Sequence, residues 1–191
     1  MPPPKPDPAV LAEQLAVERP PPPVDRWNPP LSGEMDLRIA RNGAWYHEGT
    51  AFQREALVRL FASILRRDED GHHYLVTPVE KWRIQVDDAP FVAIRVDATG
   101  AGSSQALTFT TNVGDTLTAG PEHPLAVEYR EPGGEPSPYL HVRGRLRALL
   151  SRAVFVELIG LGEERNTPEG RCYGVWSLGE FFVMGRLDEG S

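Results

Sequence analysis

The fold of this 191-residue chain is decided by two stretches of similar pattern, LRIARNGAWY at residues 37–46 and YLHVRGRLRA at residues 139–148. Each predicts a strand, a glycine turn and a returning strand. Apolar residues at helical spacing follow each stretch, around Arg54 and around Arg152, and a further strand comes after each helix. This order predicts an internal duplication, and we expect a ligand at the seam between the two copies.

The first copy carries the local signals of a hairpin followed by a helix. Leu37 and Ile39 alternate with Arg38 and Ala40, as a half-buried strand requires. Asn42-Gly43 is the preferred two-residue hairpin turn, in which both central residues adopt positive φ. Thr50 and Gln53 have the spacing of a capping box, so the helix is predicted to begin there.

The middle of the chain is rich in short strands. Alternating apolar residues occur at 82–86, 92–96, 107–109 and 127–129, separated by turn-forming residues. Regular short strands predict a strongly bent antiparallel sheet or partial barrel. Ser151 then lies where a side chain would cap the second helix.

The first 33 residues are expected to be a proline-rich disordered tail. Prolines lack an amide hydrogen and favour extended chain, and they cluster at 2–4, 20–23 and 29–30. Between the clusters, Val10, Leu11 and Leu15 could form one face of a short helix. Such a helix is too short to be stable alone. The alternative is a docking segment, either for a partner or for the body of this protein.

Composition limits the classes of function. The formal net charge is −7, so we expect no nucleic-acid partner, because neutralising phosphates requires surplus Lys and Arg. The single cysteine, Cys172, is expected to be a buried packing residue, and no cysteine zinc cage can form. No stretch approaches the ~20 apolar residues of a membrane-spanning helix, and no signal peptide is evident. We therefore expect a cytoplasmic protein without a membrane partner.

An excess of arginine late in the chain is the clearest local charge anomaly. It comprises Arg143, Arg145, Arg147 and Arg152. Guanidinium groups bind planar or phosphate anions through paired hydrogen bonds, so the excess indicates an anion site. The alternative is the solvent face of a two-sided strand. No phosphate loop, zinc-protease motif or nucleophile elbow is present, and we expect no metal and no cofactor.

Several stretches together resemble the bacterial domain-of-unknown-function family numbered 1285. They are IARNGAWYHEG (39–49), REALVRLF (54–61), YLVTPVEK (74–81), DAPF (88–91), TFTTNVGD (108–115), YLHVR (139–143) and Ser151-Arg152. The resemblance implies a cytoplasmic protein with an internal duplication and a C-terminal domain like a pleckstrin-homology fold. It also implies a nucleotide-like ligand at the domain interface and a role in signalling. It implies no catalytic residue.

The expected fold class is α+β with two subdomains built from the duplicated strand-turn-strand-helix-strand unit. The tail at 1–33 precedes an N-terminal α+β subdomain at 34–78. A C-terminal subdomain follows at 79–191, as a bent antiparallel sheet or partial barrel with a helix, like a pleckstrin-homology domain.

The leading functional hypothesis is a non-catalytic sensor or adaptor that binds a small anionic, nucleotide-like ligand at the seam. The predicted ligand-binding residues are Trp45, His47, Arg54, Lys81, Arg143 and Arg152. Tryptophan would stack on the ligand and the arginines would hold phosphate or carboxylate. The alternative is a protein-interaction module that uses the proline-rich tail and the arginine face. An enzyme is the third possibility.

Overall fold

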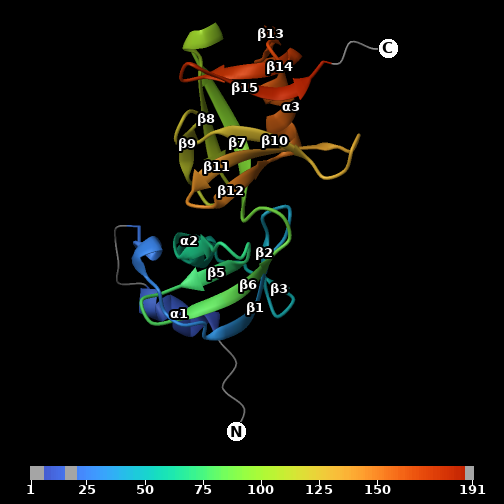
Figure 1. The fold of residues 1–191 in the computed structure, drawn as a ribbon. Coiled ribbons are helices and arrows are strands. Elements are labelled where there is room, and N and C mark those ends of the chain that lie inside the picture. The colour runs from blue at the N-terminus through green and yellow to red at the C-terminus, as the bar shows by residue number, and fades with distance from the viewer. Residues whose placement is uncertain (1–6, 16–20, 188–191) are drawn as a thin grey trace. The chain divides into compact units, whose positions relative to one another are not determined.

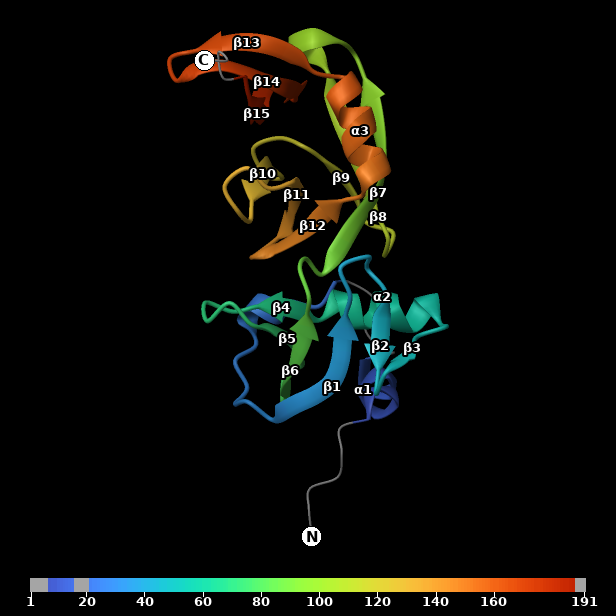
Figure 2. The ribbon, with the colours of Figure 1, turned by 90° about the vertical axis from the view of Figure 1, so that its right-hand side faces the viewer.

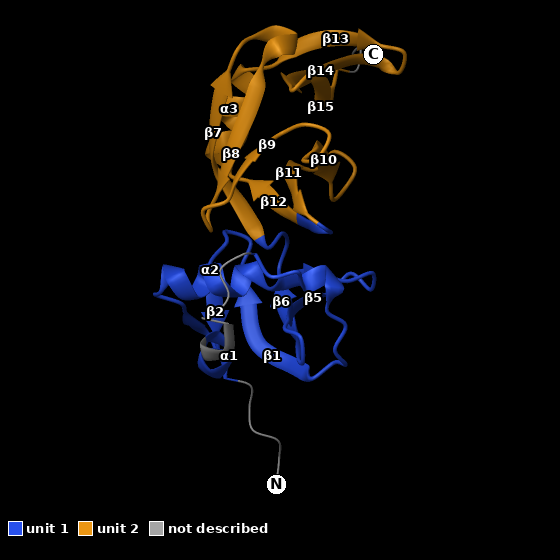
Figure 3. Ribbon diagram, turned by 90° about the vertical axis from the view of Figure 1, so that its left-hand side faces the viewer, with its two compact units in different colours: residues 1–90, 144–146 blue, residues 91–143, 147–191 orange. Residues whose placement is uncertain are grey.

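The computed structural model describes residues 7–15 and 21–187 and divides into two compact units. Unit 1 comprises residues 1–90 and 144–146, and unit 2 comprises residues 91–143 and 147–191 (Figure 3). We predicted the boundary between 78 and 79, whereas the units divide after Pro90. The reason is that the strand at Lys81–Val86 pairs with two strands of the first unit, so it belongs to that sheet.

Unit 1 is a six-stranded sheet with helical segments (Figure 1). Its strands are β1 (Gly33–Ile39), β2 (Trp45–His47), β3 (Thr50–Ala51), β4 (Leu65–Arg67), β5 (His73–Val76) and β6 (Lys81–Val86). Its helices are α1 (Pro8–Leu15), the 3-10 turn η1 (Val24–Arg26) and α2 (Glu55–Ser63). The strand order is β3-β2-β1-β6-β5-β4, and β1 runs parallel to β6 while the other neighbours are antiparallel.

The core of unit 1 lies between α2 and one face of this sheet. The buried members of β1 alternate along the strand, as predicted, and include Leu37 and Ile39. From α2, the fully buried ring of Phe61 stacks on Trp45, with 6.4 Å between ring centroids. One face of the sheet is therefore apolar and covered, which leaves the alternating polar side chains on the other face.

Two local predictions in the first copy need correction. Between β1 and β2 the chain turns at the predicted hairpin, but only Gly43, with φ +87°, adopts the left-handed conformation that we expected of both central residues. The helix begins at Glu55, not at the predicted capping box. Thr50 instead pairs with His47 in the β2–β3 ladder, so its backbone is already extended.

Part of the predicted disordered tail is ordered. Leu11 of α1 is buried, and α1 packs against α2. Val24 of η1 is also buried. A solvated leader would not bury apolar side chains in this way. These residues therefore fit the alternative prediction, a segment that docks on the body of this protein. Residues 1–6 and 16–20 of the predicted tail lie outside the described residues.

Unit 2 contains a second six-stranded sheet and a smaller sheet (Figure 2). The first sheet consists of β7 (Phe91–Thr99), β8 (Ala106–Thr111), β9 (Thr116–Thr118), β10 (Leu125–Tyr129), β11 (Pro136–Arg143) and β12 (Leu146–Leu150), in the order β10-β11-β12-β7-β8-β9. The second consists of β13 (Glu163–Thr167), β14 (Gly170–Ser177) and β15 (Glu180–Arg186). The helical segments are η2 (Gly102–Ser104) and α3 (Arg152–Gly160), and α3 packs along β7 (Figure 2).

The predicted fold class is confirmed: both units are α+β and repeat the strand-turn-strand-helix-strand unit. The hairpin β1–β2 followed by α2 corresponds to the hairpin β11–β12 followed by α3. The curled sheet of unit 2 is compatible with the predicted pleckstrin-homology-like half-barrel. Ser151 caps α3 as predicted, since its Oγ accepts the Val154 amide at 3.3 Å, and Cys172 is buried.

Candidate functional site

A cavity of about 1040 Å³ lies within unit 1 and is lined by residues of β1, β2 and β6 and by residues at and beside the turn between β4 and β5. Its charged and polar lining residues are Glu34, Asp36, Arg38, Tyr46, Arg67, His72, His73, Arg83, Gln85 and Asp88. Three arginines, three carboxylates and the aromatic Tyr46 are therefore among the residues that line one cavity. Ligand sites are concave in the same way, although their walls are usually more apolar.

The polar lining that β1, β2 and β6 contribute follows from strand periodicity and register. Successive side chains of a strand point to opposite faces, so Glu34 and Arg38 lie opposite the buried residues of β1. Arg38 pairs with Tyr46 on β2 and with Gln85 on β6, while Glu34 pairs with Arg83. The register thus places these side chains side by side across three neighbouring strands.

Arg38 is held in a bidentate ion pair. Its Nε lies 3.0 Å from each carboxylate oxygen of Asp87, and its Nη2 also bonds to that carboxylate. The hydrogen bonds that Arg38 donates to the Asp87 carboxylate raise the pKa of Arg38 and lower the pKa of Asp87. Its guanidinium also lies 5.8 Å from the centre of the Tyr46 ring. Arg38 is therefore fixed in place and its charge is balanced.

Arg83 is also balanced by a carboxylate, with its Nη1 at 3.4 Å from Glu34 Oε1. Arg67 differs. Its Nε donates to the carbonyl oxygen of Gly71 at 3.2 Å, and among the described residues no carboxylate pairs with it. Of the three cavity arginines, Arg67 is therefore the one that no acid among residues 7–15 and 21–187 neutralises.

This lining could accept a ligand with groups of both kinds. Arginines bind oxyanions, the carboxylates of Glu34 and Asp36 accept hydrogen bonds from hydroxyl or amino groups, and Tyr46 offers an aromatic surface. Within residues 7–15 and 21–187, no group of three or more His, Cys, Asp or Glu is arranged to hold a metal ion. None of the described helices is long and apolar enough to cross a membrane.

Two of the predicted ligand-binding residues of unit 1 lie in aromatic contacts on the other side of the sheet. Trp45 is only 2% exposed and stacks on Phe61, so its ring is not open to a ligand in this structure. Its Nε1 is buried and has no hydrogen-bond partner among the described residues. His47 stacks on Phe52, with 6.3 Å between ring centroids.

The other two predicted residues of unit 1 differ in their surroundings. Lys81 bonds to Asp68 at 2.6 Å and lies 4.2 Å from the centre of the Tyr74 ring, so it belongs to a local ionic network. Arg54 is exposed at the N-terminal end of α2, and no partner for its side chain is found among the described residues. None of the four predicted residues of unit 1 lines the cavity.

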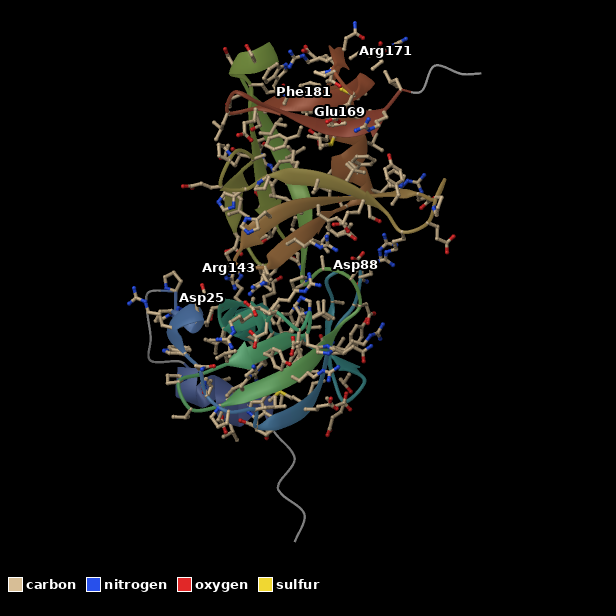
Figure 4. The ribbon with its side chains drawn as sticks, viewed as in Figure 1. Asp25, Asp88, Arg143, Glu169, Arg171 and Phe181 are labelled. Atoms are coloured by element: carbon tan, nitrogen blue, oxygen red, sulfur yellow. The ribbon has the colours of Figure 1, made fainter. Side chains whose placement is uncertain are left out.

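In unit 2, the predicted arginines are dispersed. Arg143, labelled in Figure 4, ends β11, and its guanidinium lies 5.5 Å from the centre of the Phe91 ring. Arg152 is exposed at the first position of α3. Arg147 forms an ion pair with Glu128. The predicted seam site that would combine these residues with those of unit 1 stays a prediction.

The sequence analysis did not predict the residues that line the cavity, because a sequence shows the periodicity of a strand but not which strands pair with one another. The alternation of Glu34, Asp36 and Arg38 was visible and predicts an outward face. The parallel pairing of β1 with β6, which brings Arg83 beside Glu34, joins strands far apart in the sequence. No local signal indicates that contact.

Comparison with known proteins gives the family. Two family models match the chain. The model for the N-terminal domain of DUF1285, a domain of unknown function, matches residues 22–89, and the model for the C-terminal domain of this protein family matches residues 90–184. A crystal structure of a DUF1285 family protein from Silicibacter pomeroyi DSS-3 is similar, with 46% identity, a TM-score of 0.88 and coverage of 96% of this chain and 97% of that chain.

A second crystal structure, of a DUF1285 family protein from Shewanella baltica OS155, has 28% identity and a TM-score of 0.52, covering 66% of this chain and 91% of that one. No similar protein was found among the curated proteins. The two domain matches together span most of the chain, and their boundary, after residue 89, lies one residue before the division into units after Pro90. The chain therefore belongs to the DUF1285 family.

Proposed function

We propose that this protein is a non-catalytic sensor or adaptor that binds a small anionic, nucleotide-like ligand in the cavity of unit 1. The observation that carries the proposal is the presence of Arg38, Arg67 and Arg83 around one cavity in a chain of net charge −7. In an acidic protein, arginines gathered around a concave surface favour an anion over a neutral ligand.

The carboxylates of the same cavity support a ligand that carries hydrogen-bond donors as well as negative charge. A purely anionic ligand would be repelled by Glu34, Asp36 and Asp88. A nucleotide has phosphate oxygens for guanidinium groups and hydroxyl or amino groups that donate to carboxylates. Its base could lie against Tyr46, which is half-buried on β2.

The test is isothermal titration calorimetry of the full chain with nucleoside monophosphates and diphosphates, the matching uncharged nucleosides, and inorganic phosphate. We expect the nucleotides to bind and the nucleosides to bind at least about tenfold more weakly, because the charged hydrogen bonds are lost. A folded protein that binds no member of this panel would contradict the proposal.

A pair of matched variants tests the location. Gln85→Trp places a large ring on the open face of β6 and should block the cavity. Gln53→Trp places the same ring at an exposed position that does not line the cavity. We expect the first variant to lose binding and the second to keep it. Equal binding by both variants would mean that the ligand does not occupy this cavity.

The alternative of a protein-interaction module stays a prediction, as does the cytoplasmic location. The packing of Leu11 in α1 indicates that this part of the N-terminal segment is used within unit 1, so it does not favour the segment as a peptide for a partner.

A further inference from the structure

We propose that Arg67 is the principal anion-binding residue of the unit 1 cavity and that it grips two oxygens of one oxyanion through its two Nη groups. The inference rests on the proposed function and goes beyond it, because it names the group that the ligand must present. That group is a phosphate or a carboxylate with at least two accessible oxygens.

The first support is the position of Arg67. It is the last residue of β4, pairs with His73 on β5 and is half-buried at the cavity wall. The turn that follows is tight: the Gly71 amide donates to the Asp68 carbonyl at 3.0 Å, and the Asp68 amide donates to the His72 carbonyl at 3.1 Å. Gly71 has φ +83°, a conformation that favours glycine. The turn thus fixes the carbonyl oxygen that holds Arg67.

The second support is the way in which Arg67 is held. A guanidinium has five N–H donors, one on Nε and two on each Nη. In Arg67 the Nε–H is used by the carbonyl oxygen of Gly71 at 3.2 Å, which is a neutral acceptor. The bond orients the group without cancelling its charge. The two Nη atoms then present a pair of parallel donors, which is the geometry that binds carboxylate and phosphate bidentately.

The third support is the contrast with the other two arginines of the cavity. Arg38 already binds both carboxylate oxygens of Asp87, and Arg83 lies 3.4 Å from Glu34. An incoming anion would have to displace those carboxylates or share the guanidinium with them. Binding to Arg67 requires no such displacement, so the first and strongest contact of an anion is expected there.

The experiment compares Arg67→Gln with Arg59→Gln in the full chain. Arg59 is an exposed arginine of α2 outside the cavity, so its variant removes the same charge from the protein elsewhere. Binding of AMP, inorganic phosphate and acetate is measured by calorimetry, and thermal unfolding reports that each variant is folded. The acetate titration distinguishes a site for any oxyanion from one selective for phosphate.

We expect Arg67→Gln to weaken AMP binding by about tenfold to a hundredfold, as loss of a charged hydrogen-bonded pair does. Arg59→Gln should change it by less than about twofold, because a distant exposed charge is screened. Arg67→Lys keeps the charge but loses the paired donors, so it should show an intermediate loss, and it serves as the test if the glutamine variant does not fold.

The possible failures are distinct. If the wild type binds AMP and Arg67→Gln or Arg67→Lys binds as well as Arg59→Gln, the role of Arg67 is overturned while the proposed function stands. If the folded wild type binds no nucleotide, phosphate or acetate, the proposed function itself fails, and this inference fails with it.

Discussion

Arg66 joins the N-terminal segment to the sheet of unit 1, and its replacement by alanine is the most direct test of that attachment. Its Nη1 donates to the carbonyl oxygens of Val24 at 2.9 Å and Trp27 at 2.7 Å. Its Nε and Nη2 bond to the carboxylate of Asp68 at 2.6 and 3.2 Å. Lys81 binds the same carboxylate at 2.6 Å, so one acid connects two cations.

The expected cost follows from these contacts. The side chain of Arg66 is 15% exposed and that of Asp68 is 20% exposed, so water only partly replaces what is lost. Each hydrogen bond from a charged donor contributes about 1.5–3 kcal/mol. Arg66→Ala removes two hydrogen bonds to carbonyl oxygens and two to the carboxylate of Asp68. Lys81 still balances Asp68, which limits the penalty. We expect Arg66→Ala to reduce the free energy of unfolding by about 3 kcal/mol.

Chemical denaturation followed by circular dichroism gives this free energy, and hydrogen exchange of residues 24–27, whose amides include three that bond within the segment, reports whether the segment detaches. The matched control is Arg59→Ala. Arg59 lies 3.7 Å from Glu55 in an exposed pair, which contributes at most about 0.5 kcal/mol. If Arg66→Ala costs no more than Arg59→Ala, and the amides of residues 24–27 stay protected, the attachment does not depend on Arg66.

The same network predicts a dependence on pH. Burial alone raises the pKa of Asp68, but hydrogen bonds from Arg66 and Lys81 outweigh it, and the pKa lies below its usual value. A lowered folded-state pKa stabilises the protein above the unfolded value of about 3.9, and this stability is lost as the pH falls through the folded-state pKa. The difference in stability between wild type and Arg66→Ala should therefore shrink between neutral pH and about pH 3. A constant difference would show that Asp68 is not the linked group.

Three further changes have expected outcomes. A Cβ on Gly174 would come within 2.3 Å of a carbonyl oxygen of β15, so Gly174→Ala should lower the free energy of unfolding, measured with denaturant, by about 3 kcal/mol. The control is Gly160→Ala at the end of α3, where a Cβ meets nothing within 4 Å, and this change should leave the free energy of unfolding unchanged or raise it. Ser151→Ala removes the cap of α3 and should lower the unfolding free energy by about 1 kcal/mol, and an unchanged value would mean that the cap contributes nothing. Leu11→Ala should abolish hydrogen-exchange protection of α1, while Val10→Ala, at a side chain 53% exposed, should leave it intact.

Local features could be predicted from the sequence because they depend on neighbours in the chain. The hairpin at Gly43, the cap at Ser151 and the apolar face of α2 all follow from residues within a few positions of one another. The repeat of these signals in the same order was enough to predict the duplicated α+β fold. The start of α2 was missed, because Thr50 satisfies strand pairing in β3 before it could cap a helix.

The candidate site could not be predicted in the same way. Trp45 was a reasonable choice for stacking, since buried and exposed tryptophans look alike in a sequence, but in the structure Phe61 covers it. Arg67 had no local signal that distinguished it from Arg66, its neighbour in β4. Arg66 bonds to the N-terminal segment and to Asp68, whereas Arg67 bonds to the carbonyl oxygen of Gly71 and lines the cavity.

The sequence by itself determined which segments become strands and helices and that their order occurs twice, because alternation, helical spacing and turn residues act over short distances. Only the tertiary structure decided that β1 pairs in parallel with β6 and that three arginines line one cavity. It also decided that acids neutralise Arg38 and Arg83, whereas Arg67 bonds to a carbonyl oxygen. Such contacts join residues far apart in the chain, and their charge balance depends on distances of a few ångströms that no one-dimensional pattern specifies.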